Sequence, residues 1–243
     1  MPTRHATRIL RQRHQPLLAA SATACHTAAM AQQLGYHALV EIFSRFQARD
    51  PEPEGELYHT NAYTLLVAVV LSAQATDAGV NKATMALFAV ADSAESMLAL
   101  GEAVLTGHIR TIGLYPTKAR HVMALSRILA EQYGGAVPSS RAALQSLPGV
   151  GRKTANVVLN IWWGQPAQAV DTHIFRVGNR TGIAPGRDVE TVERSVEDNI
   201  PAPFQRHAHH WLILHGRYIC VARKPKCPAC LIRDLCPYED KTP

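Results

Sequence analysis

Leu147-Pro-Gly-Val-Gly-Arg-Lys-Thr-Ala-Asn156 is the stretch of sequence that decides the fold. One helix is expected to end near Leu147 and a second to begin after Gly151, so the stretch predicts two helices joined by a tight turn. We expect this turn to need glycine at positions 149 and 151, where a side chain would clash or the backbone would take a positive φ.

The start of the second helix is also a candidate anion site. The first amides of a helix have no partner inside it, and beside glycines they can receive a phosphate oxygen. An ordinary corner between two helices is the alternative interpretation. The presence of Arg152, Lys153 and Thr154 next to the paired glycines favours the helix–hairpin–helix motif, which binds a nucleic-acid backbone without reading its bases.

The rest of the chain is helical in pattern, so the predicted fold class is all-α. Apolar residues recur at steps of three to four from Leu34 onward, while residues 63–71 are apolar all round and predict a helix buried at the centre of a domain. Further helices are expected at 81–90, 102–109, 116–132, 141–147, 153–162, 172–179, 189–199 and 205–221, with Gly, Pro and Ser between them.

Composition excludes several protein classes. The 243 residues are 47% hydrophobic and 18% charged, which excludes a disordered polyelectrolyte and a collagen-like repeat. The longest apolar run, 62–73, is shorter than the roughly 20 residues of a membrane span, so no membrane partner is expected. The formal net charge of +6 is compatible with a polyanionic partner.

Residues 1–33 form a basic extension with no acidic side chain, since Glu41 is the first acidic residue of the chain. We expect a disordered tail, with an organellar targeting segment as the alternative. Cys25 lies within this extension and has no obvious role.

Lys153 falls in the first turn of the second hairpin helix, near the positive end of the helix dipole. A surface lysine would simply be solvated. In a cleft, burial and the dipole would both disfavour the ammonium form, and a free amine is the nucleophile that Schiff-base chemistry requires.

Asp171 directly precedes an apolar-periodic helix, in Val-Asp-Thr-His-Ile-Phe-Arg176. It is an excellent N-cap residue, and capping alone would explain it. The functional interpretation places its carboxylate beside Lys153, where it could stabilise a cationic sugar and assist proton transfer. His173 is expected to contact a phosphate or to be structural.

Cys220, Cys227, Cys230 and Cys236 follow the spacing C-x6-C-x2-C-x5-C. Zinc sites usually show two C-x2-C pairs, so zinc is the alternative and a 4Fe–4S cluster the favoured cofactor. Ligating thiols must stay reduced, which favours a cytoplasmic, nucleoid-associated protein. Arg223 and Lys224 project from the same loop as candidate phosphate contacts. The histidines at 207–215 are expected to serve core packing.

These motifs together resemble endonuclease III, the helix–hairpin–helix DNA glycosylase/AP lyase family. The resemblance is carried by residues 71–77, 111–115, 147–156, 170–176, 209–217 and the four cysteines. It implies two domains: a six-helix barrel at 55–165, and an iron–sulfur cluster domain made from 34–54 and 166–238.

The resemblance also implies an activity and a set of site residues. Lys153 would be the nucleophile, Asp171 its partner, and Gln74 and Leu114 the side chains that fill the duplex where a nucleotide has been extruded. The implied protein is a monomer that binds damaged double-stranded DNA, removes oxidised pyrimidines and cuts the strand by β-elimination. The alternatives are a mismatch-specific thymine glycosylase on the same fold and a non-catalytic, redox-sensing DNA-binding protein.

Overall fold

The computed structural model describes residues 32–243, and within them every regular element is a helix. The predicted all-α class is confirmed. The α-helices are α1 (Tyr36–Arg49), α2 (Ala62–Ser72), α3 (Asp77–Phe88), α4 (Ala94–Leu100), α5 (Glu102–Ile109), α6 (Tyr115–Tyr133), α7 (Arg141–Gln145), α8 (Arg152–Trp163), α9 (Thr172–Thr181), α10 (Val189–Asn199) and α11 (Gln205–Tyr218). Two 3₁₀ turns are η1 (Ala202–Phe204) and η2 (Cys227–Ala229).

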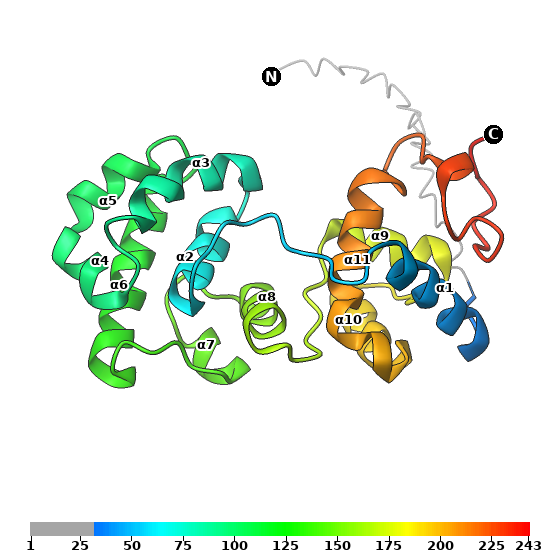
Figure 1. Ribbon diagram of the computed structural model, residues 1–243, viewed down its shortest axis with the longest axis horizontal. Coiled ribbons are helices and arrows are strands. Elements are labelled where there is room, and N and C mark those ends of the chain that lie inside the picture. Colours follow the sequence, from blue (N-terminus) through cyan, green and yellow to red (C-terminus); the bar gives the residue numbers. More distant parts are fainter. Residues whose placement is uncertain (1–31) are drawn as a thin grey trace, which may run out of the picture.

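The buried apolar residues form two separate clusters. One runs from Tyr63 to Ala167 and is built by α2 to α8. The other joins α1 to the chain from Val170 to Ile232, through α9, α10 and α11. Figure 1 shows the two groups side by side, with the segment between α1 and α2 crossing from one to the other. Ala167 of the first cluster lies just beyond the predicted boundary at 165/166, and the boundaries at 54/55 and 165/166 stay a prediction.

Helix α2 is the centre of the first cluster, as its apolar sequence predicts. Every residue from 63 to 71 is buried, so the helix has no solvent-facing stripe. It packs against α3, α6 and α8. A capping box fixes its start, because the Asn61 side chain accepts from the Thr64 amide at 2.8 Å and the Thr64 hydroxyl accepts from the Asn61 amide at 3.0 Å.

Helix α4 was not predicted from the pattern of apolar residues. It has only seven residues, too few for a helical period to stand out. Its start carries a readable signal, since the Ser93 side chain accepts from the Ser96 amide at 3.1 Å and Ser96 reciprocates in a capping box.

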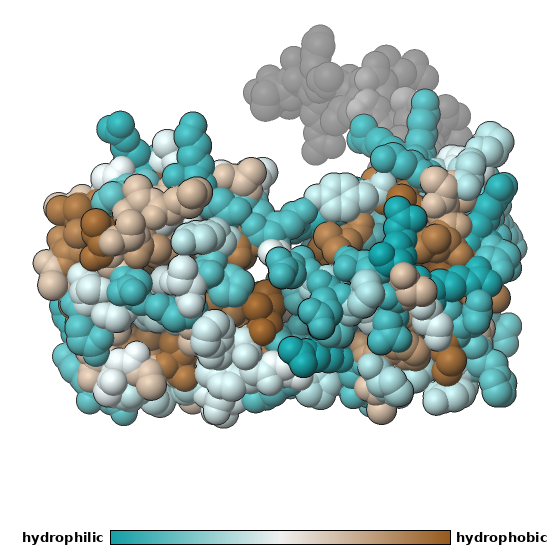
Figure 2. Space-filling view, viewed as in Figure 1, coloured by the Kyte–Doolittle hydropathy of each residue, from teal (hydrophilic) through white to brown (hydrophobic). Residues whose placement is uncertain are grey.

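No helix among residues 32–243 is long and apolar enough to cross a membrane. Figure 2 shows a hollow between the two groups of helices, edged by hydrophilic side chains. The predicted basic tail at 1–33 falls almost wholly outside the described residues, as does Cys25.

Candidate active site

A cavity of about 350 Å³ opens between the two clusters. Its walls come from the segment before α2, the end of α2, helix α8, the start of α9 and helix α11. The cavity is of the size that proteins use for small ligands, and it contains both predicted catalytic residues, Lys153 and Asp171.

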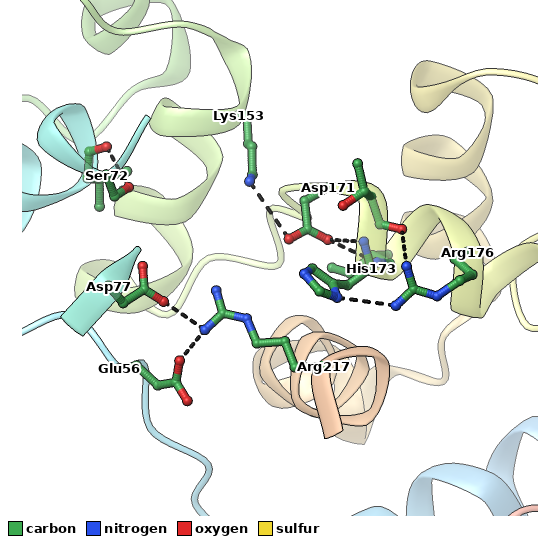
Figure 3. A network of polar contacts seen from close by, with 11 residues as sticks. Glu56, Ser72, Asp77, Lys153, Asp171, His173, Arg176 and Arg217 are labelled. Carbon is green, nitrogen blue, oxygen red and sulfur yellow. Dashed lines mark hydrogen bonds and ion pairs between the residues drawn. The ribbon is translucent and has the colours of Figure 1, made fainter. Parts of the chain in front are cut away.

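The Lys153 amine faces the Asp171 carboxylate across this cavity, with 3.8 Å between Nζ and Oδ2 (Figure 3). Lys153 belongs to α8 in the first cluster, and Asp171 precedes α9 in the second. The lysine side chain is 56% exposed and that of Asp171 12%. The lysine side chain is therefore more than half exposed, whereas the hypothesis from the sequence concerned a lysine buried in a cleft.

Asp171 is also the N-cap of α9, so both interpretations of this residue find support in the geometry. Its Oδ1 accepts hydrogen bonds from the His173 amide at 2.8 Å and from the Ile174 amide at 2.9 Å. The other oxygen, Oδ2, points to Lys153. The cap therefore fixes the carboxylate in the orientation that faces the amine.

The predicted DNA contact His173 packs inward in this structure. Its Nδ1 lies 3.2 Å from Arg176 Nη2, and its Cβ lies 2.8 Å from where a side chain at Gly216 would begin. Gly216 thus lets α11 approach α9 closely. The sequence left two roles open for His173, a phosphate contact and a structural contact. The packing against Gly216 is a structural contact, and the phosphate contact stays a prediction.

An ion-pair network lines the cavity opposite Lys153. Arg217 on α11 donates to Asp77 Oδ2 at 2.7 Å and also pairs with Glu56 (Figure 3). Glu56 additionally accepts from the Tyr218 hydroxyl. Since Asp77 starts α3 and Glu56 lies between α1 and α2, the network joins the two clusters at the cavity wall.

The hairpin turn needs glycine at one of the two predicted positions. Gly149 has φ +79°, and a Cβ there would lie 2.9 Å from His121. Gly151 has φ −85° and open space around it, so the expectation of a steric need at 151 is wrong. Gly151 is instead the N-cap of α8, without a side-chain cap, and leaves the first amides of that helix uncovered.

Arg152 does not extend freely from the hairpin. Its guanidinium pairs with Glu193 of α10, with Nε 3.0 Å from both carboxylate oxygens. Glu193 is 3% exposed and also accepts from Asn156 at 3.0 Å. These contacts tie α8 to α10. A role of Arg152 in DNA binding stays a prediction.

Gln74 and Leu114 lie at the mouth of the cavity and near it, in unusual backbone conformations. Their φ angles are +55° and +60°, in the left-handed region that side chains rarely occupy. Leu114 is 62% exposed despite being apolar, and Gln74 is exposed too. Such strain gathers where structure serves function. Lys224 has the third non-glycine positive φ among the described residues, at +53°.

Two of the four α11 histidines, His209 and His215, are buried, as predicted, and the other two, His207 and His210, are partly buried. His209 is 2% exposed, and burial with the neighbouring His210, Lys153 and Arg217 lowers its pKa to about 3. Burial also lowers the pKa of His210 to about 4. Both line the cavity as neutral imidazoles.

The four cysteines of the C-terminal loop line one small cavity together with Arg180 and His215. Arg180 Nη1 lies 3.8 Å from Cys220 Sγ, and His215 Nε2 lies 3.7 Å from Cys230 Sγ. Burial raises the pKa of the Cys230 and Cys236 thiols, so thiolates here need a cationic partner.

This donor set fits an iron–sulfur cluster. All four ligands are sulfur, and N–H groups of the surrounding shell point at them. As the side chains lie, no three His, Cys, Asp or Glu residues from 32 to 243 converge on a single ion.

Comparison with known proteins gives the family. Residues 67–202 match the HhH-GPD superfamily of base excision DNA repair proteins, and residues 220–236 match the iron–sulfur binding domain of endonuclease III. The chain is 56% identical to endonuclease III of Treponema pallidum (strain Nichols), a match that covers 83% of this chain and 94% of that protein. It is 55% identical to endonuclease III of Escherichia coli (strain K12), over 83% and 96% of the two chains.

The chain belongs to the endonuclease III family.

Solved structures agree with this assignment. A trapped endonuclease III–DNA covalent intermediate matches with a TM-score of 0.77 and 42% identity, over 84% of this chain and 97% of that one. A thermostable thymine-DNA glycosylase matches with a TM-score of 0.73 and 27% identity, over 83% and 96%. This endonuclease III family member therefore acts in base excision repair, and the predicted iron–sulfur cluster is confirmed.

The cavity of this endonuclease III family member is also lined by residues that the sequence analysis did not single out: Glu56, Asp77, His209 and Arg217. Three of them lie inside the segments that carry the resemblance, 71–77 and 209–217, so the signal was present. Nothing in the spacing of Glu56 indicates its pairing with Arg217, because the two are 161 positions apart.

Proposed function

We propose that this protein is a bifunctional DNA glycosylase/AP lyase that removes oxidised pyrimidines from damaged double-stranded DNA. The observation that carries the proposal is the Lys153 amine 3.8 Å from the Asp171 carboxylate, inside a cavity of about 350 Å³. A pyrimidine must leave the helical stack before its sugar can be attacked, and the cavity offers a place for the extruded base. The covalent endonuclease III–DNA intermediate, a structure similar to this one, supports a nucleophilic amine.

The reaction follows from these two groups. Uncharged Lys153 Nζ attacks the sugar C1′, a bond forms between them, and the base leaves with the electron pair of the glycosidic bond. Asp171 stabilises the positive charge that develops on the sugar and accepts a proton from the lysine nitrogen. Because the protein leaves Lys153 half exposed, bound DNA would cover the rest of this side chain and exclude water from it.

Strand cleavage uses the same covalent bond. Opening of the sugar ring gives a Schiff base between Nζ and C1′, which acidifies the C2′ proton. Loss of that proton expels the 3′ phosphate by β-elimination, and water then hydrolyses the Schiff base to release the enzyme.

The DNA backbone is held by groups on both sides of the cavity. The uncovered amides at the start of α8, after Gly151, receive a phosphate, and Arg223 and Lys224 contact the backbone from the cysteine loop, where both are exposed. The iron–sulfur cluster, when bound to Cys220, Cys227, Cys230 and Cys236, supplies four metal–thiolate bonds that brace this loop. Gln74 and Leu114 occupy the space that the extruded nucleotide leaves. We propose that the protein acts as a monomer on nucleoid DNA in the cytoplasm.

Borohydride trapping tests the proposal. The protein is incubated with a panel of single-lesion duplexes, including an oxidised pyrimidine and undamaged T opposite G, with and without borohydride. Lys153→Ala is expected to lower trapping by roughly 10³-fold or more, because it removes the nucleophile. Lys82→Ala, at an exposed lysine on α3, serves as the matched control and is expected to trap like the wild type.

Three results would contradict this assignment. Undiminished trapping by Lys153→Ala would show that another group is the nucleophile. Processing of undamaged T opposite G in preference to oxidised pyrimidines would favour the thymine glycosylase, to which the 27% identical structure points. Binding of damaged duplex without any base release would favour a non-catalytic DNA-binding protein.

A further inference from the structure

Lys118 is a buried lysine that the proposed mechanism does not use. It lies in the first turn of α6, and only 5% of the residue is exposed. Its Nζ donates a hydrogen bond of 2.9 Å to the carbonyl oxygen of Leu71, 47 positions earlier in the chain. No ion pair engages Lys118 among residues 32–243, and burial lowers the pKa of its ammonium group.

Helix electrostatics give this position a specific meaning. The last carbonyls of a helix lack partners inside it and carry partial negative charge, and α2 has no basic residue in its own last turn. The Lys118 ammonium, which belongs to another helix, supplies the positive charge that α2 lacks at this end. It does so at the positive end of α6, where a cation destabilises the helix that bears it. The lysine therefore serves the junction between α2 and α6 rather than α6 itself.

The two helix ends joined by Lys118 carry Gln74, which lines the cavity, and Leu114, both with a positive φ. Gln74, with φ +55°, comes three residues after Leu71. Leu114, with φ +60°, is the N-cap of α6, and its carbonyl accepts from the Lys118 amide at 3.1 Å. The two turns are also close neighbours, since a Cβ added at Gly113 would lie 4.0 Å from the Gln74 carbonyl oxygen.

We propose that Lys118 is a positioning residue that holds the Gln74 turn and the Leu114 turn at a fixed separation, so that both side chains enter the duplex together when a nucleotide is extruded. This inference rests on the proposed function, in which these two side chains fill the duplex. Two strained turns persist only where surrounding contacts over-determine them. A preset pair of side chains also avoids the cost of ordering each one during extrusion.

The test compares Lys118→Met with the wild type on two substrates: an abasic site in single-stranded DNA and the same site in a duplex. Borohydride trapping rates are measured on both. A single strand has no stacked helix to open, so its rate reports Lys153 and the active fraction alone. The duplex-to-single-strand ratio is expected to fall about 10-fold, because small misplacements of a positioned group are costly. Lys82→Met is the matched control and should keep the wild-type ratio.

A second readout requires no chemistry. The duplex carries 2-aminopurine next to a tetrahydrofuran abasic analogue, which the enzyme binds but cannot cleave. Wild-type protein is expected to raise 2-aminopurine fluorescence by disturbing the stack, and Lys118→Met to give a smaller rise at saturating protein. If Lys118→Met yields no folded protein, Lys118→Gln keeps a hydrogen-bond donor without the charge and is expected to lower the trapping ratio about 3-fold.

Equal losses on single-stranded and duplex DNA, or an unchanged ratio in both variants, would overturn the positioning role. A wild-type protein that traps neither substrate would instead contradict the proposed function. The two failures are therefore distinguishable within one experiment.

Discussion

Helices α8 and α9 begin on opposite walls of the same cavity, and their first turns differ in one respect. The start of α8 follows Gly151 and has no side-chain cap, so its amides are open and Lys153 is half exposed. The start of α9 is closed by Asp171, whose Oδ1 accepts two backbone hydrogen bonds. The comparison shows an exposed amine facing a carboxylate that two backbone hydrogen bonds hold in place, which suits a nucleophile that must reach the sugar and a charge that must stay fixed.

Removing the charge while keeping the cap tests this contrast most strongly. In Asp171→Asn, the amide oxygen can still accept from the His173 and Ile174 amides, but the carboxylate that faces Lys153 is lost. Base release is expected to slow by roughly 100-fold, the usual cost of removing one electrostatic group from a transition state. Cleavage at a preformed abasic site should fall less. The measurement is single-turnover kinetics on the two substrates.

The control is Asp188→Asn, at the N-cap of α10, where the side chain accepts from Thr191 at 2.8 Å outside the cavity. It is expected to leave both rates near the wild type. Equal loss on both substrates in Asp171→Asn would mean that the residue only caps α9.

Glu193 of α10 holds the start of α8 in place through its contacts with Arg152 and Asn156. In Glu193→Gln, Arg152 and Asn156 lose the charge of their shared acceptor. The free energy of unfolding is expected to fall by about 2 kcal/mol, less than for a fully buried pair because Arg152 is 46% exposed. Denaturant unfolding measures the change. Glu190→Gln, an exposed glutamate in the first turn of α10, is the control, and an equal loss there would refute the tie between α8 and α10.

The last prediction concerns pH and the α11 wall of the cavity. The pKa values of buried His209 and His210 are lowered to about 3 and 4, whereas the ordinary value is 6.5. Below pH 6.5 the unfolded chain therefore binds protons that the folded chain does not. Stability should fall as pH drops from 6.5 toward 4, by about 1.4 kcal/mol per pH unit for each histidine.

Denaturant unfolding at pH 7, 6 and 5 checks this slope. Lys153, Arg217 and His210 face His209, while His207 and Asp50 act on His210, so the slope belongs to the whole group. His209→Leu is expected to make the slope shallower by about one proton. His37→Leu, at an exposed histidine of α1, should leave it unchanged, and an equal flattening there would contradict the assignment.

Much of the site could be predicted from the sequence because its parts are local. The helix at 63–71 is apolar on every side, so it must be buried. Asp171 lies directly before the helix that it caps. The four cysteines fall within one loop. Each of these signals lies within a few turns of chain, where composition and spacing decide the structure. The family resemblance then indicated that Lys153 and Asp171 meet.

Only the tertiary structure decided how distant groups pair. Arg152 with Glu193, Lys118 with the Leu71 carbonyl and Arg217 with Asp77 join positions 41, 47 and 140 residues apart. The steric role of Gly149, and its absence at Gly151, likewise depends on where His121 lies. A charged residue in a sequence could pair with many other residues, and a glycine could lie against many different neighbours. Which one it meets is fixed by the packing of whole helices, and no local pattern records that.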